Sequence, residues 1–140
     1  MIPIRTAGPD DRDAVIALWQ AAGLTRPWND PAADFALALA GPTSSVLVAA
    51  AGAALVGTVM AGFDGHRGWL YYLAVAPARQ RAGIGRALVA AAEAVLAAQG
   101  CPKVELMVRA DNRVAAGFYR ALGYDDQAVA VFGKRLDGRG

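Results

Sequence analysis

A glycine-rich, basic turn is the segment of this chain whose residue types are best suited to bind a ligand. It lies within the sequence LAVAPARQRAGIGR, residues 73–86. Gly83 and Gly85 leave no side chain between backbone and ligand, and the first N–H groups of a helix lack internal partners and carry the positive end of its dipole. Three arginines add charge nearby: Arg79, Arg81 and Arg86. The segment predicts a phosphate site; the alternative is a merely tight turn with solvated arginines.

Other nucleotide-binding motifs fit this segment less well. No Lys-Ser or Lys-Thr follows the glycines as in a P-loop, and Leu88 stands where the third glycine of the dinucleotide pattern belongs. Glu105 lies at roughly the right distance for a ribose-binding acid, but an antiparallel middle of the chain contradicts a doubly wound sheet. Nicotinamide binding is therefore a distant alternative.

The elements that must position this turn follow from apolar spacing and from turn residues. Alternation and β-branched runs predict strands, helical spacing predicts helices, and Asp30-Pro31 and Asn112 are start signals for two of the helices. We expect a single domain, 1–140, of α/β class, with a mixed, mostly antiparallel central sheet flanked by helices. The expected strands are 2–6, 45–51, 54–63, 69–75, 104–108 and 124–136, and the expected helices are 14–22, 31–40, 83–99 and 112–122.

Composition limits the function classes. The 140 residues carry a formal charge of +2 without a basic run, which disfavours nucleic acid as a partner. Gly41 to Phe63 has no charged residue, but its glycines favour a buried hairpin over a membrane span. Cys101 is the only cysteine, and the start of the chain lacks the layout of a signal peptide. We expect a cytoplasmic protein without a membrane partner.

Two motifs in order resemble those of the GNAT superfamily of N-acetyltransferases. Gln80 to Gly85 is similar to its Q/R-x-x-G-x-G/A signature, and Asn112, Tyr119 and Gly123-Tyr124 resemble its later N-x(6)-Y-x-x-x-G-[FY] segment. The expected element order also parallels the family fold over almost the whole chain. Residues 26–30 and 64–68 resemble a small bacterial subgroup, the YpeA-like acetyltransferases.

The resemblance implies acetyl-CoA as co-substrate and direct transfer of its acetyl group to a primary amine of a small molecule or of a peptide or protein N-terminus. Tyr119 would protonate the leaving thiolate, and the backbone N–H of Val75 would stabilise the oxyanion. Asn112 would bond the pantetheine arm. The cofactor-binding residues implied are Leu73, Ala74, Val75, Gln80, Arg81, Ala82, Gly83, Ile84, Gly85, Arg86, Asn112 and Tyr119. No metal is required, and a homodimer is typical of small relatives.

The general base is where the sequence departs from the family. Many relatives place a Glu where this chain has Trp69 or Met107. Glu105 is the first substitute, followed by two residues of the preceding turn, Asp64 and His66. A weak base favours an acceptor amine of low pKa, such as an α-amine. By analogy, Trp28, Asn29 and Asp30 also belong to the acceptor site.

Two alternatives to this mechanism remain. The missing carboxylates leave open a catalytically silent module that only binds acyl-CoA. Cys101 is a less favoured nucleophile, because it stands in a turn and His66 is its only possible partner.

Overall fold

The structure is a computed structural model that describes residues 2–139 and contains two compact units, Met1–Met107 and Val108–Gly140. The first unit is built on a five-stranded sheet with the order β1-β2-β3-β4-β5. Neighbouring strands are antiparallel except for β4 and β5, which are parallel. The strands are β1 (Ile4–Thr6), β2 (Ser44–Ala51), β3 (Ala54–Phe63), β4 (Gly68–Val75) and β5 (Val104–Leu106). The mixed, mostly antiparallel sheet expected from the sequence is confirmed.

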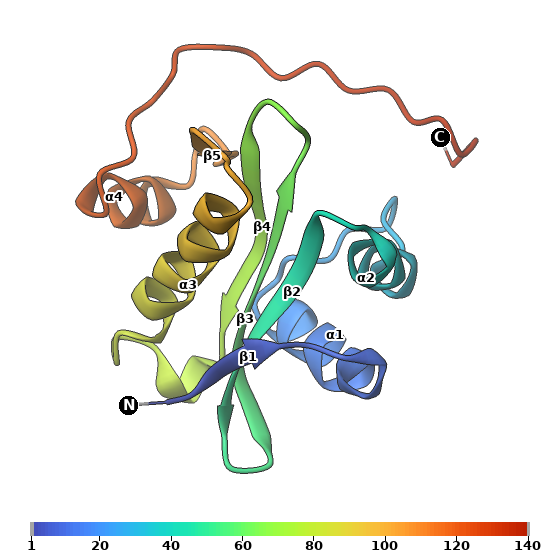
Figure 1. Ribbon diagram of the computed structural model, residues 1–140, viewed down its shortest axis with the longest axis vertical. Helices are drawn as coiled ribbons and strands as arrows, with labels where there is room; N and C mark the ends of the chain where they lie inside the picture. The colour runs from blue at the N-terminus through green and yellow to red at the C-terminus, as the bar shows by residue number, and fades with distance from the viewer. Residues whose placement is uncertain (1, 140) are drawn as a thin grey trace. The chain divides into compact units, whose positions relative to one another are not determined.

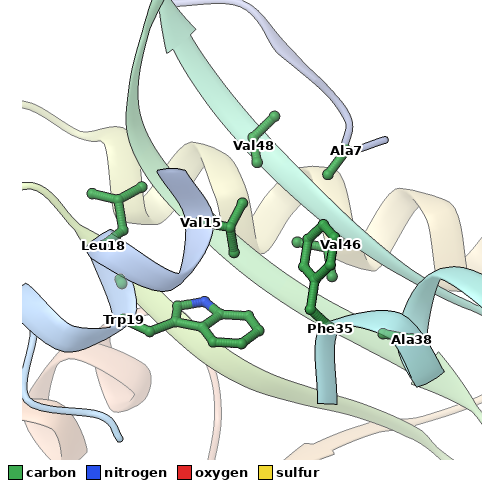
Figure 2. Close-up of a cluster of buried hydrophobic side chains, with 9 residues drawn as sticks. Ala7, Val15, Leu18, Trp19, Phe35, Ala38, Val46 and Val48 are labelled. Carbon is green, nitrogen blue, oxygen red and sulfur yellow. The ribbon is translucent and has the colours of Figure 1, made fainter. Parts of the chain in front are cut away.

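Helices α1 (Arg12–Ala21) and α2 (Pro31–Ala40) cover one face of this sheet (Figure 1). Their apolar residues recur at helical spacing, so each helix turns one stripe inward. Phe35 of α2 lies beside Val46 of β2, and Val15 and Trp19 of α1 belong to the same buried cluster, as Figure 2 shows. Trp19 is fully buried and meets Phe35 edge to face, with ring centroids 6.4 Å apart. These contacts fix α1 and α2 on the sheet.

Helix α3 (Ile84–Ala98) packs on the opposite face of the sheet (Figure 1). Two strand glycines allow it to lie close. A Cβ at Gly57 would stand 2.8 Å from the Leu88 side chain, and one at Gly68 would stand 2.9 Å from that of Leu96. Because those distances are below any normal contact, larger residues at either site would push α3 away from the sheet.

Local signals in the sequence account for several boundaries. Asp30 caps α2 by accepting the N–H of Ala33 at 3.1 Å, with Pro31 at the first helical position. Strands β2 and β3 form the hairpin expected in place of a membrane span. Among the residues that the structure describes, no helix has the length and apolar character needed to cross a bilayer.

The second unit contains α4 (Arg113–Ala121), whose first turn is capped by Asn112 through the N–H of Ala115 at 3.0 Å. The strand predicted over 124–136 is wrong: residues 124–139 of this unit form no strand. A turn interrupts the alternation, because Asp126 Oδ1 accepts the N–H of Ala128 at 2.7 Å and Ala128 is left-handed, with φ 55°. The apolar side chains beyond it, such as Phe132, are exposed.

Candidate functional site

Strand β4 carries a bulge at its centre. Thr58 pairs with Ala74 and Met60 pairs with Tyr71, so Tyr72 and Leu73 together face the single residue Val59 of β3. Tyr72 adopts φ 53°, a left-handed conformation that a tyrosine rarely takes. A bulge bends its strand and re-aims the groups that follow, and strained residues of this kind cluster at functional sites.

Beyond this bulge, β4 presents an open strand edge. Strand β5 pairs with β4 only from Gly68 to Leu70. Within the described part of the first unit, Leu73, Ala74 and Val75 have no strand partner on that side. Because the Ala74 side chain is buried, what this segment offers a ligand is mainly its backbone. An extended group that carries amides can pair with such an edge as an added strand does.

The glycine-rich turn follows directly after β4. A short 3-10 helix, Pro77–Arg79, leads to Gly83, which caps α3 in the left-handed conformation with φ 81°. Arg81 is also left-handed, with φ 65°. The first internal bond of the helix runs from Ala87 N to Gly83 O, at 3.0 Å, so the N–H groups of residues 84–86 precede it. Alternating left-handed residues and helix-start amides form an anion-binding concavity.

The arginines of this turn are available to an anion. Arg79, Arg81 and Arg86 are exposed, and none of them has an ion pair with a carboxylate in the described residues. Gln80, Ala82 and Gly83 are exposed as well, whereas Ile84 is buried and fastens the start of α3 to the sheet. The turn thus exposes cationic side chains to solvent, while Ile84 anchors the start of α3 to the sheet.

On the face of α1 and α2, the bulge residue Tyr72 is held by two contacts. Its ring stacks on Trp19 with centroids 3.8 Å apart and planes at 10°. Its hydroxyl donates to Asp34 Oδ2 at 2.7 Å. Burial, and then the hydrogen bond with Asp34, raise the pKa of Tyr72 well above its ordinary value, so the phenol stays protonated. It therefore donates a hydrogen bond to the carboxylate and is not itself a base.

Two buried polar atoms beside the bulge have no hydrogen-bond partner among the described residues: Trp19 Nε1 and Thr58 Oγ1. Trp19 stacks on Tyr72, and Thr58 pairs with Ala74, so both adjoin the bulged segment. Unsatisfied buried polar atoms are uncommon in folded proteins and mark places where a water or a ligand group is expected.

A hollow of about 200 Å³ opens near the start of β4, on the sheet between β2 and the β3–β4 turn. Asp64 lies at its rim: Oδ1 accepts the N–H groups of His66 and Arg67, and Oδ2 accepts Trp69 Nε1 at 3.2 Å. These bonds, chiefly the one from the Arg67 backbone, hold the pKa of Asp64 below its usual value. The hollow is lined by Thr43, Ser44, Gly62, Phe63, Asp64, Trp69 and Tyr71.

The predicted base Glu105 is already paired. Its Oε1 lies 3.3 Å from Nε of Arg67, and both side chains are partly exposed. An ion pair occupies a carboxylate and leaves it less available to an incoming amine. Glu105 stands opposite Trp69 in the β4–β5 register, whereas Met107 falls beyond the end of β5. The structure therefore places Glu105 beside the start of β4, three residues before the bulge.

The other predicted acceptor residues occupy the loop that leads into α2. Trp28 is half exposed, and Asn29 donates its backbone N–H to Arg26 O at 3.0 Å. Asp30 is the helix cap, and Asp34, which binds Tyr72, follows one helical turn later. His66 lies in the turn that Asp64 organises and is exposed.

In the second unit, Asn112 and Tyr119 lie at the start and in the last turn of α4. Tyr119 packs edge to face against Phe118 and Tyr124, with centroids 5.0 and 5.8 Å away. Burial raises the pKa of Tyr119, so this phenol holds its proton at neutral pH. That state is the one required of a proton donor.

Sequence reasoning missed three features: the bulge at Tyr72, its partner Asp34, and the hollow next to Trp69 and Tyr71. Asp34 belongs to the first turn of α2, where an acidic residue is common and does not by itself indicate a site. The one available signal was the pair Tyr71-Tyr72. Neighbours in a regular strand face opposite sides, so only a bulge can bring both aromatic side chains to the same side.

Comparison with known proteins relates the chain to one family. Residues 13–124 match the model of the acetyltransferase (GNAT) family. An acetyltransferase of Pectobacterium atrosepticum is 46% identical over 133 residues, covering 95% of this chain and 94% of that protein. An uncharacterized N-acetyltransferase of Yersinia pestis is 44% identical over the same length and shares of the two chains.

Solved structures show the same fold at low sequence identity. The aminoglycoside N-acetyltransferase AAC(6')-Iy in complex with CoA is 18% identical, with a TM-score of 0.83 over 97% of this chain and 95% of that one. A transcriptional regulator from Bacillus halodurans is 19% identical, with a TM-score of 0.84 over 96% of this chain and all of that one. At these identities the likeness concerns the fold alone.

Proposed function

This chain belongs to the GNAT acetyltransferase family, and from that membership we propose that it transfers the acetyl group of acetyl-CoA directly to a primary amine of a small molecule. The observation that carries the proposal is the joining of the open edge of β4 to the cationic turn at Gly83. The edge suits the amides of a pantetheine arm, and the turn suits a diphosphate. The acetyl group would then lie along the bulged segment.

The reaction forms one C–N bond and breaks one C–S bond. The neutral amine attacks the thioester carbonyl, the backbone N–H of Val75 stabilises the oxyanion, and the thiolate leaves. Tyr119, protonated because burial raises its pKa, gives the thiolate its proton. Cys101 has no part in this scheme: its thiol donates to Lys103 O at 3.3 Å.

The proton of the acceptor ammonium requires a base, and two carboxylates are available. Glu105 is occupied by its ion pair with Arg67. Asp34 has one oxygen bound by Tyr72, directly at the bulge, which leaves the other oxygen for the amine. We therefore assign the base to Asp34 and keep Glu105 as the second candidate. Carboxylates in general are weaker bases than alkylamines, which favours an acceptor amine that loses its proton readily.

Several solved structures of this fold are aminoglycoside acetyltransferases, which makes small amines the first acceptors to test. The test is an acetyl-CoA turnover screen over amino sugars, alkyl diamines and peptides with free N-termini, monitored by release of the CoA thiol. The wild type should acetylate at least one small amine, and Tyr119→Phe should lower kcat about 100-fold with little change in KM. A protein that binds acetyl-CoA and releases no thiol with any acceptor would be a silent binding module, and the proposal would fail.

A further inference from the structure

The hollow near the start of β4 combines a fixed negative charge with aromatic walls. Phe63, Trp69 and Tyr71 contribute rings, and Asp64 contributes the carboxylate. A cation over an aromatic face is attracted to it within about 6 Å of the ring centroid, and a carboxylate beside the rings adds a charge-assisted hydrogen bond. Such a combination recognises an ammonium group.

The carboxylate of Asp64 has capacity left for a ligand. Oδ1 is saturated by the N–H groups of His66 and Arg67, but Oδ2 accepts only Trp69 Nε1. An ionised carboxylate offers about four acceptor sites, so one site on Oδ2 remains open. Because its pKa is lowered by these backbone bonds, Asp64 stays ionised at neutral pH and serves as an anchor, not as a base.

The guanidinium of Arg67, the arginine of the same turn, is engaged by other groups and does not pair with Asp64. Arg67 has its Nε against Glu105 at 3.3 Å and donates a further bond from Nη1 to His66 O at 3.0 Å. The guanidinium is thus directed to Glu105 at the β5 side of the turn. Tyr71 is a neutral phenol, because burial, and then Asp64, raise its pKa. The charge of the hollow therefore comes from Asp64.

The end of the hollow formed by Asp64 and Trp69 lies away from the bulge, while Tyr71 extends the lining toward it. Trp69 precedes the bulge residue Tyr72 by three positions, which corresponds to about 10 Å along a strand at about 3.3 Å per residue. The hollow has a volume of about 200 Å³. Pockets that enclose whole drug-sized ligands measure roughly 300–1,000 Å³, so this hollow holds only one end of a molecule.

We propose that this hollow binds a second, non-reacting ammonium group of the acceptor, and that the substrates are therefore diamines or polyamines whose two nitrogens span the distance from Asp64 to the bulge. The inference rests on the proposed function and narrows its substrate class. The reacting amine lies at Tyr72 while the distant ammonium is held between Asp64 and the rings of Trp69 and Tyr71.

The first experiment measures kcat/KM for linear diamines with two to eight methylene groups, each relative to the monoamine of the same chain length. The preference for the diamine should rise with length and reach at least tenfold when the nitrogens are about 10 Å apart. Asp64→Asn should reduce that preference at least fivefold, since Asn keeps an oxygen for the turn but lacks the charge. Asp10→Asn, which removes the charge of an exposed carboxylate elsewhere, is the matched control. A preference near one at every length, or an equal loss in both variants, overturns the inference.

The second experiment does not depend on turnover. The indole N–H signal of Trp69, identified by its loss in Trp69→Phe, is followed by NMR during titration with the longest diamine. Saturable movement in the wild type and none in Asp64→Asn is expected, because Trp69 Nε1 and the ammonium share Oδ2. If acetyl-CoA binds but no amine is acetylated, the proposed function fails while this titration still decides the inference: an unmoved signal refutes it.

Discussion

The hydroxyl of Tyr72 donates a 2.7 Å hydrogen bond to Oδ2 of Asp34, which joins the bulge of β4 to helix α2. The two residues are 38 positions apart in the chain. Tyr72 holds a left-handed backbone conformation while its ring stacks on Trp19. The strand therefore bends at Tyr72, the residue whose hydroxyl holds the Asp34 carboxylate of α2.

If Asp34 is the base, its replacement should cost more activity than that of any other carboxylate near β4. Asp34→Asn should lower kcat/KM for the best acceptor about 100-fold, and Glu105→Gln should lower it by less than tenfold. Steady-state kinetics at saturating acetyl-CoA measure both. A larger loss in Glu105→Gln than in Asp34→Asn would identify Glu105 of β5 as the base.

If Asp34 is the base, Tyr72 acts through it as a positioning residue. Tyr72→Phe keeps the stack on Trp19 and removes the hydroxyl, so kcat/KM should fall about tenfold while the fold remains. In the Asp34→Asn background the same change should have little further effect, because the bond it removes has already lost its charged acceptor. Additive losses in the double variant would show that the hydroxyl acts independently of Asp34.

Gly83 is a position where the backbone conformation itself is needed. It has φ 81°, and a Cβ there would meet no atom within 4 Å, so Gly83→Ala introduces left-handed strain without a clash. The expected cost is about 1–2 kcal/mol in the free energy of unfolding, together with weaker binding of acetyl-CoA. Gly117→Ala in α4 also has free space and no positive φ, and it should stabilise the protein by about 0.5–1 kcal/mol. Urea denaturation of the two variants separates the effects.

The arginines of the turn should recognise phosphate and nothing else of the donor. Replacing Arg81 and Arg86 by Gln should raise the Kd for acetyl-CoA about tenfold or more, because charge-assisted bonds to phosphate are lost. Binding of S-acetylpantetheine, which lacks the diphosphate, should not change. Calorimetric titration with both ligands tests this prediction, and an equal loss for the two would place the arginines elsewhere in the site.

The pair Arg5–Asp11 makes stability depend on pH. The hydrogen bonds from Arg5, at 2.8 and 2.9 Å, and from the Gly8 N–H lower the pKa of Asp11 from 3.8 to about 2. A lowered carboxyl pKa stabilises the fold above pH 3.8, and that stabilisation is lost as the pH falls through about 2. The urea midpoint of the wild type should therefore exceed that of Asp11→Asn at pH 7, and the two should converge between pH 4 and 2. Asp13→Asn, at a strongly exposed position, should show no such convergence.

The sequence predicted most of the fold because its signals are local. Asp30 and Asn112 cap the helices that they were expected to cap, and Gly83 stands at the N-cap of α3. The bulge could not be predicted in this way, since it depends on how Thr58 and Met60 of β3 align with β4. The predicted strand over 124–136 failed for a related reason: alternation indicates a strand only where another strand is available, and the turn at Asp126 breaks it.

The same distinction applies to the site. Residues of the glycine-rich turn are contiguous and could be identified from their order. Asp34 and Tyr72 become neighbours only after the chain has folded, and Asp34 belongs to no recognisable motif. Asp64 was a candidate from the sequence, but its bond to Trp69 was not. The prediction that Glu105 is the base rested on strand alternation, which says which face a residue lies on but not that Arg67 will occupy its carboxylate.

The short pairing of β5 with β4 has a further consequence for handling the protein. An uncovered strand edge is a template for another extended backbone, whether that backbone belongs to a cofactor or to a second protein molecule. Donor binding and self-association would then compete for the same hydrogen-bonding groups. Preparations stripped of acetyl-CoA should therefore precipitate most readily, and added CoA should keep the protein in solution.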